Sequence, residues 1–303
     1  MSAHTLWGLF PIYWRQIEAA DSAELVCHRI VWSFVSLAIL LPILLRMGWW
    51  GGWRVVLESV RNRRVWLLYS VAAVMIAINW LAFIWAVNHG RVLEASLGYY
   101  INPLFNVLLG VVVLGERLRR WQWVAVAIAT LGVGIMAVGG GGLPWVSLTM
   151  AISFAFYGLV KKKAHLPILV GLMIEMTVLV VPAAIYLSMR FADGVSAIQT
   201  GSPLVMGMLL MAGLVTITPL ALFATAVRRV DLSVIGILQY IGPTLQFLVA
   251  AVLYGEALGG TRIVGFVFVW IALIVFVIAT HPPKRSIVLF RGRRREVAPG
   301  SSD

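Results

Sequence analysis

One stretch constrains the fold of this chain more than any other, the apolar run from about Leu93 to Leu114. It holds roughly the 20 residues that an α-helix needs to cross the ~30 Å hydrocarbon core of a bilayer at 1.5 Å per residue. Two asparagines and a proline interrupt the apolar residues, and an unpaired amide in hydrocarbon costs several kcal/mol. We therefore expect a transmembrane helix whose amides face other helices or a water-filled cavity.

The polar residues of this run share one face of the predicted helix with two small residues. The five recur at helical spacing at Ala95, Tyr99, Asn102, Asn106 and Gly110. Pro103 cannot donate to the carbonyl of Tyr99, which leaves an acceptor on the same stripe. The stripe is predicted to bind a substrate. Packing between helices is the alternative, because Asn and small residues also join helices in membranes.

Composition indicates a polytopic membrane protein. Hydrophobic residues make up 61% of the chain and charged residues 12%, with a mean hydropathy of +0.94. Segmentation by apolar runs predicts about ten transmembrane helices. A net charge of +12 would suggest nucleic acid in a soluble chain, but here most Lys and Arg lie in short loops between apolar runs, so no nucleic-acid partner is expected.

The basic residues fall in alternate loops. Five groups share one side of the membrane if the helix count holds: 46–64, 117–120, 161–163, 228–229 and 284–295. Positive loops stay in the cytoplasm, which predicts that both termini are cytoplasmic. Residues 281–303 are then a basic cytoplasmic tail.

The two halves of the chain resemble each other at an offset of 140 positions. The specific part of the match is Tyr-Ile-x-Pro followed at a fixed distance by Gly-Glu, at Tyr100–Glu116 and again at Tyr240–Glu256. An odd number of helices per half makes the repeats inverted in the membrane. We therefore predict an all-α polytopic membrane protein with two inverted five-helix repeats, residues 1–139 and 143–280.

Inverted repeats put a substrate site near the membrane midplane, between the halves. The second half offers Gln239, Tyr240 and Gln246, with Pro243 freeing the carbonyl of Gln239. Pro103 and Pro243 are the predicted helix-breaking residues. The predicted substrate-binding residues are Arg29, Trp32, Asn79, Tyr99, Asn102, Asn106, Tyr157, Gln239, Tyr240 and Gln246.

Charged residues within the spans suggest further roles. Arg29 can bind a carboxylate or extend to the lipid headgroups, and the two readings stay open. Glu175 and His28 are the candidates for proton coupling. Glu116 and Glu256 follow a glycine at the ends of their helices and are interpreted as structural. Tyr157 can line a cavity or belong to an interfacial aromatic belt.

No motif indicates catalysis or a cofactor. The chain has one cysteine, Cys27, so neither an intrachain disulfide nor a cysteine metal cluster is possible, and no metal or cofactor is expected. There is no P-loop, HExxH or GxSxG. We therefore expect that the protein is not an enzyme.

Five segments carry a specific resemblance: HRIVWSF at 28–34, NWLAFIWAVNHGRVLEASLGYYINPLFN at 79–106, GERLRRWQW at 115–123, SFAFYGLVKKK at 153–163 and QYIGPTLQF at 239–247. They resemble the RarD permeases of the EamA group, in the drug/metabolite transporter superfamily. The resemblance implies a bacterial inner-membrane permease with a ten-helix inverted-repeat fold, in a family labelled by chloramphenicol sensitivity. The family has about two more helical turns before Trp7, so the start of this chain is interpreted as misassigned or truncated.

The predicted function is secondary transport by alternating access. The cargo would be a small amphiphilic metabolite or drug, such as chloramphenicol or an amino-acid-like compound. A flippase for a lipid-linked substrate is the alternative, and a scaffold that transports nothing would leave the buried amides on both repeats without a purpose. The expected partners are the small-molecule substrate and membrane lipid, with the protein a monomer or homodimer.

Overall fold

The computed structural model describes residues 1–17, 20–49, 52–89, 91–138, 145–255 and 260–280, and every regular element assigned in them is helical. The first half contains α1 (Ser2–Trp14), α2 (Ser22–Arg46), α3 (Gly52–Val60), α4 (Arg63–Asn88), α5 (Val92–Val112) and α6 (Arg120–Val138). The second contains α7 (Trp145–Lys163), α8 (Ile168–Ala192), α9 (Ala197–Thr200), α10 (Pro203–Arg229), α11 (Leu232–Leu238), α12 (Ile241–Leu248) and α13 (Gly260–Thr280). A short 3-10 helix follows α1 (Arg15–Ile17), and a short π-helix follows α12 (Val249–Leu253).

Eight spans in the described part of the chain are long and apolar enough to cross a membrane, which makes this a polytopic α-helical membrane protein. They are α2, α4, most of α5, α6, α8, α10, the α11–α12 segment to Leu253, and α13 from Ile263. The sequence predicted about ten spans. The two others, α1 with 13 residues and α7 with three lysines at its end, are not among the eight.

Large apolar side chains cover the outside of the bundle. Leu67 and Leu81 of α4, Val181 of α8 and Ile278 of α13 are each more than 60% exposed. In water such a surface would drive aggregation, whereas in a bilayer it contacts lipid tails at no cost. These helices therefore present their apolar faces to lipid.

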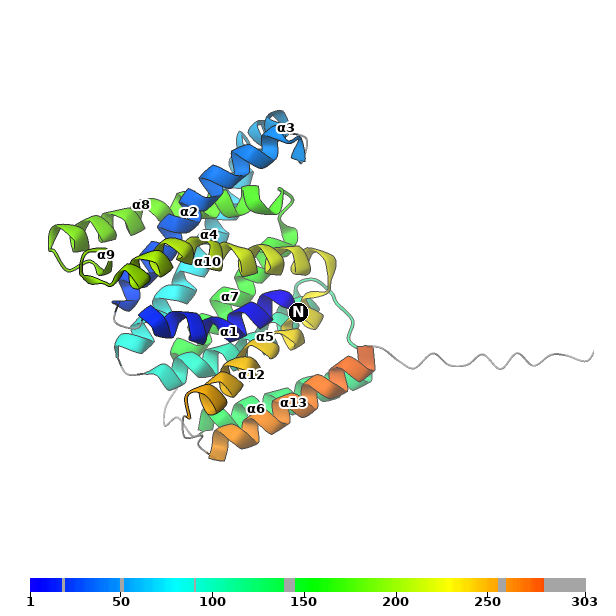
Figure 1. The fold of residues 1–303 in the computed structure, drawn as a ribbon. Coiled ribbons are helices and arrows are strands. Elements are labelled where there is room, and N and C mark those ends of the chain that lie inside the picture. The colour runs from blue at the N-terminus through cyan, green and yellow to red at the C-terminus, as the bar shows by residue number, and fades with distance from the viewer. Residues whose placement is uncertain (18–19, 50–51, 90, 139–144, 256–259, 281–303) are drawn as a thin grey trace, which may run out of the picture.

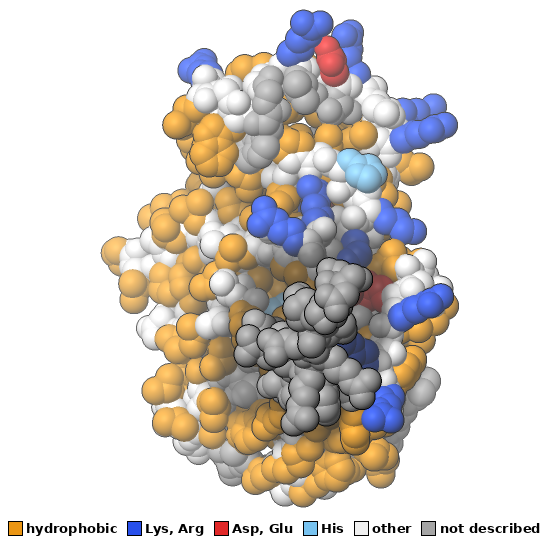
Figure 2. Space-filling view, turned by 90° about the vertical axis from the view of Figure 1, so that its right-hand side faces the viewer, with side chains coloured by type: hydrophobic (Ala, Val, Ile, Leu, Met, Phe, Trp, Pro, Cys, Tyr) orange, Lys and Arg blue, Asp and Glu red, His pale blue; other side chains and the backbone are white. Residues whose placement is uncertain are grey.

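The basic loops gather at one end of the bundle. In Figure 1, α8 begins and α10 and α13 end toward the right-hand side, where α6 also begins. Contacts join these segments there: the Lys162 ammonium donates to the carbonyl of Val230 at 2.8 Å, and the Arg119 guanidinium to that of Ala279 at 3.4 Å. Figure 2 looks onto this end and shows many Lys and Arg side chains and few acidic ones. We call it the basic end.

Helix contacts come in matched pairs. The contact of α4 with α8 has its counterpart in that of α10 with α2, and α5 packs on α7 as α12 packs on α1. The antiparallel pair α6 and α13 forms one edge of the bundle (Figure 1). Gly115 and Gly255, 140 positions apart, both adopt a positive φ, of 69° and 62°. In the predicted repeat, helices that are 140 positions apart would exchange packing partners in this way.

The helix around Pro243 breaks, although its local hydrogen bonding differs from the prediction. The segment divides after Leu238 into α11 and α12. The carbonyl of Gln239 is not free, because the amide of Gly242 donates to it at 3.0 Å. Pro103, by contrast, lies inside an unbroken α5. A tight turn has therefore replaced the expected open acceptor at Gln239.

Glu116 joins the two halves at the basic end. Its carboxylate accepts hydrogen bonds from the amides of Leu232 at 2.7 Å and Ser233 at 2.9 Å, and from the Ser233 hydroxyl at 2.6 Å. These are the first residues of α11, whose amides have no partner within the helix. Glu116 thus has the structural environment expected from the sequence, while its counterpart Glu256 lies outside the described residues.

The Glu116→Ala variant should lower the free energy of unfolding by about 1–2 kcal/mol, because it removes the carboxylate that caps α11. Thermal unfolding of the purified protein in detergent measures this. Glu58→Ala is the matched control, since the Glu58 side chain is 66% exposed and its ion pair is with Arg54, whose side chain is 91% exposed. Equal stability of the two variants would contradict a capping role.

Candidate substrate cavity

A cavity of about 560 Å³ lies between the two halves. The first half contributes α1, α2, α4 and α5, and the second contributes α7, α10 and the α11–α12 segment. Its rim includes Arg15 and Ser96, which are exposed, and Ser22 at the start of α2. Both α2 and α5 begin at the end of the bundle opposite the basic end. The cavity therefore reaches the surface on the side away from the basic loops.

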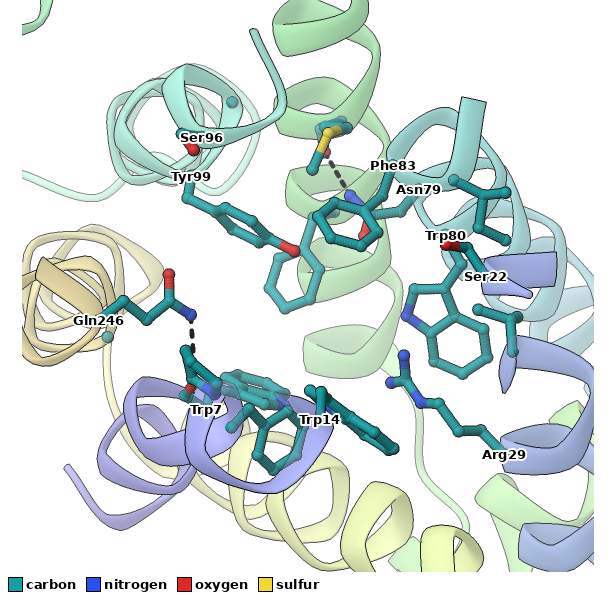
Figure 3. A pocket seen from close by; sticks show the side chains of 18 of the residues that line it. Trp7, Trp14, Ser22, Arg29, Asn79, Trp80, Phe83, Ser96, Tyr99 and Gln246 are labelled. Carbon is teal, nitrogen blue, oxygen red and sulfur yellow. Dashed lines mark hydrogen bonds between the residues drawn. The ribbon is translucent and has the colours of Figure 1, made fainter. Parts of the chain in front are cut away.

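Aromatic side chains form much of the cavity wall. Trp7 and Trp14 come from α1, and Trp80 and Phe83 come from α4 (Figure 3). Phe154 comes from α7. Trp7 packs edge-on against Phe154, with the ring centroids 5.7 Å apart. Such a wall accepts a flat or apolar molecule of drug size.

Amides and a phenol form the polar part of the wall. Asn79 donates its Nδ2 to the carbonyl of Met150 at 2.8 Å, and Gln246 donates its Nε2 to the carbonyl of Trp7 at 3.1 Å (Figure 3). These bonds fix both amides in place, and no described donor occupies their oxygens. The Tyr99 ring also extends into the cavity (Figure 3). The wall thus presents hydrogen-bonding groups in fixed positions.

Arg29 of α2 places a positive charge against the aromatic wall. Its Nε donates to the hydroxyl of Thr216 on α10 at 3.0 Å. The guanidinium carbon lies 4.7 Å from the ring centroid of Trp80 and 5.2 Å from that of Trp14. Figure 3 shows the guanidinium between the two indoles, facing the space that Tyr99 borders. The side chain extends into the cavity, where a binding role would place it, and that role stays a prediction.

The predicted residues divide into two groups. Those that line the cavity are Arg29, Asn79, Tyr99, Asn102, Gln239, Pro243 and Gln246. Those that do not are His28, Trp32, Pro103, Asn106, Tyr157, Glu175 and Tyr240.

Asn106 and Tyr240 join helices beneath the cavity instead of lining it. Asn106 is fully buried and donates its Nδ2 to the Oε1 of Gln239 at 2.6 Å, across the two halves. The Tyr240 hydroxyl donates to the carbonyl of Tyr100 at 3.2 Å. The Asn106 Nδ2 and the Tyr240 hydroxyl are thus paired within the protein, which is the packing role that Asn can have in membranes, while the Oδ1 of Asn106 has no partner among the described residues.

Trp32 and Tyr157 lie in contacts between helices, outside the cavity. Trp32 is at the contact of α2 with α10, where Gly213 packs against its backbone so closely that no Cβ would fit. The Tyr157 ring stacks on Phe223 with centroids 6.2 Å apart, and its hydroxyl donates to the carboxylate of Glu175 at 3.2 Å.

Glu175 belongs to a buried ion pair. The Lys161 ammonium lies 2.6 Å from its Oε1, and both side chains are fully buried. The loop position predicted for Lys161 is wrong: the residue lies within α7 and points into the bundle. Desolvated charges persist only when they are paired and hydrogen-bonded, which explains why Lys161, Tyr157 and Glu175 occur together.

His28 lies in a second buried cluster, near the start of α2. Its Nε2 is 3.5 Å from the carboxylate of Glu24. Glu24 also accepts from the Ser196 hydroxyl at 2.6 Å and the Ala197 amide at 2.7 Å, and lies 3.5 Å from Arg190. The cluster joins α2 to the segment between α8 and α10.

Sequence reasoning missed the contribution of α1. Trp7 and Trp14 line the cavity, as does His4, which packs on Trp7 with ring centroids 5.6 Å apart. Their aromatic spacing was visible, but the short apolar segment gave no reason to place them inside the bundle. Lys161 was concealed in a run of three lysines, although it follows Tyr157 by one helical turn.

Comparisons with known proteins agree with this architecture. Residues 1–138 match the EamA-like transporter family. A crystal structure of a protein with 17% sequence identity superimposes with a TM-score of 0.66, covering 92% of this chain and 96% of the other. At that identity the likeness shows the fold alone. The fold and the cavity define an α-helical membrane protein of the transporter class.

Relatives identify the family. The chain is 43% identical over 290 residues to an uncharacterized transporter of Vibrio cholerae, covering 94% of each chain. It is 42% identical over 278 residues to Protein RarD of Escherichia coli K12, covering 91% of this chain and 92% of that one. Over 277 residues it is 32% identical to the chloramphenicol-sensitive protein RarD of Pseudomonas aeruginosa, covering 91% of each. The chain belongs to the RarD permease family.

The Lys161→Met variant should lose about 3–5 kcal/mol of stability, because it leaves the Glu175 carboxylate buried without its partner. The double variant Lys161→Met with Glu175→Leu should recover most of that loss, since no unpaired charge remains. Thermal unfolding in detergent distinguishes them. Lys163→Met, at an exposed position of the same helix end, should stay near wild type. A double variant less stable than Lys161→Met would contradict this account of the pair.

Proposed function

We propose that this protein is a secondary transporter of the bacterial inner membrane for small amphiphilic molecules. Chloramphenicol and amino-acid-like compounds are the first candidates. The observation that carries the proposal is the cavity between the two halves, with an aromatic wall and fixed amides from both. Sites for drug-sized ligands have this character, largely apolar with a few polar groups that fix the orientation.

We propose alternating access as the mechanism. At the basic end the halves are joined by Asn106 with Gln239 and by Glu116 with the start of α11. Lys162 adds to this closure, 3.6 Å from Glu116. The opposite end carries the exposed cavity rim. With both termini in the cytoplasm, this conformation is open to the outside, and transport breaks the contacts at the basic end while closing the rim.

Two inverted five-helix repeats, about ten helices in all, provide the symmetry for such an exchange. The matched helix contacts and the equivalent glycines Gly115 and Gly255 support this arrangement. In an inverted repeat, the contacts that one half makes at one end are available to the other half at the opposite end. The same pair of surfaces then closes each side in turn.

We retain Glu175 and His28 as the candidates for proton coupling. Each is buried within a polar cluster that joins two helices, Glu175 with Lys161 and His28 with Glu24. A proton on Glu175 would neutralise its carboxylate and weaken the contact between α7 and α8, whereas a proton on His28 would add a positive charge beside Glu24 on α2. Coupling would then act by changing helix packing, since neither residue lines the cavity.

Proteoliposomes with labelled chloramphenicol and an amino-acid panel, with and without an imposed pH gradient, test the proposed function. Wild type should accumulate at least one cargo, and Asn102→Leu should reduce that uptake at least about tenfold, because the amide wall loses a hydrogen-bonding group. Leu108→Ala is the control, since Leu108 lies on the same helix with its side chain 51% exposed toward lipid.

Uptake that is equal in Asn102→Leu and wild type would contradict the cavity as the transport path. Flux that ignores the pH gradient and survives Glu175→Gln would exclude proton coupling through Glu175. The absence of flux for every small molecule, together with translocation of a lipid reporter, would favour the flippase.

A further inference from the structure

We propose that Arg29 is an anion-binding residue and that the cargo is an organic carboxylate with an apolar, ring-containing body. The inference deepens the proposed transport function, on which it rests, by naming the chemistry that the cavity recognises. The choice of a carboxylate rests on the positive charge of Arg29, which has no negative partner among the described residues.

No acidic residue occurs among the described residues that line the cavity. Arg29 instead contacts one neutral hydroxyl, of Thr216, and two indole faces. The nearest acidic residue on its own helix, Glu24, is engaged with Ser196, Ala197 and Arg190. The cavity is therefore positively charged as built.

The geometry of Arg29 favours recognition of a carboxylate. Its Nε is held by Thr216, which fixes the plane of the guanidinium, and no described residue accepts a hydrogen bond from its two terminal nitrogens. A guanidinium fork of this kind matches the two oxygens of a carboxylate. In Figure 3 the terminal nitrogens lie between Trp80 and Trp14 and face the cavity.

The surroundings of Arg29 specify the rest of the molecule. Trp14 and Trp80 flank the guanidinium, so an apolar group attached to the carboxylate would lie against indole faces. Farther along the wall, Tyr99 and the fixed oxygens of Asn79 and Gln246 are available to a donor on the cargo. At the rim, Arg15 adds a second positive charge that attracts anions toward the opening.

Charge also distinguishes between cargoes. A neutral amphiphile such as chloramphenicol gains contacts with the aromatic wall but leaves the Arg29 charge without a partner. A carboxylate of similar size makes the same apolar contacts and neutralises the charge as well. The cavity should therefore prefer the carboxylate whenever the two molecules share the same apolar body.

The test compares ligands that differ only in charge. Purified protein in nanodiscs is titrated by calorimetry with 3-phenylpropanoate, indole-3-propanoate and 4-phenylbutanoate, each beside its neutral primary amide. Wild type should bind at least one carboxylate about 10-fold to 100-fold more tightly than its amide. Arg29→Gln should abolish that preference and keep the amide affinity, and Arg29→Lys should retain part of the preference. The control Arg54→Gln, at a side chain that is 91% exposed, should leave the preference unchanged.

Two results would overturn the inference: no carboxylate binding more tightly than its amide in wild type, or a preference that survives in Arg29→Gln. If Arg29→Gln fails to fold, the wild-type ligand pairs and Arg29→Lys still decide. Uptake in proteoliposomes separates this inference from the proposed function. Carboxylate binding without flux would refute transport and leave the anion site standing, whereas flux of neutral cargo alone, unchanged in Arg29→Lys, would refute the anion site and leave transport standing.

Discussion

The structure depends on one constraint: hydrocarbon offers no hydrogen bonds, so every polar group inside the membrane must find a partner within the protein or a wet cavity. Asn106 meets Gln239, and Lys161 meets Glu175. These contacts hold helices together. Among the described residues the constraint is left unmet at a few buried polar atoms, such as the Oδ1 of Asn106, and in the cavity, where the charge of Arg29 has no described negative partner.

This distribution of polar groups divides the protein into a tightly packed region and a region that contains the cavity. Toward the basic end, ion pairs, amide contacts and stacked aromatic rings such as Tyr157 on Phe223 fill the space between helices. Toward the other end, aromatic walls and amides border an open volume. A transporter needs both, since contacts that close one side must be replaceable by equivalent contacts on the other. The break between α11 and α12 lies at the boundary of the two regions.

The sequence predicted the helical class, the family and the faces of α5 and the α11–α12 segment, because periodicity and the cost of buried amides determine which side of a helix is polar. The sequence could not distinguish the polar residues that line the cavity from those that pack helices together. Asn102 and Asn106 lie on one stripe, yet Asn102 borders the cavity and Asn106 meets Gln239. That difference depends on which residue of the α11–α12 segment lies opposite each asparagine, and the sequence of α5 does not contain this information. Likewise, the burial of Lys161 depends on its partner Glu175 on α8, which a run of three lysines does not indicate.

The most direct measurement is the accessibility of the cavity to a charged thiol reagent. In a Cys27→Ser background, Ser96→Cys places the only thiol on the exposed rim. If the cavity is the transport path, a membrane-impermeant methanethiosulfonate should modify this thiol from one face of the membrane only, and modification should stop uptake. Transported cargo should slow the reaction. A thiol that is modified without loss of uptake, or at a rate that cargo does not change, would contradict the account.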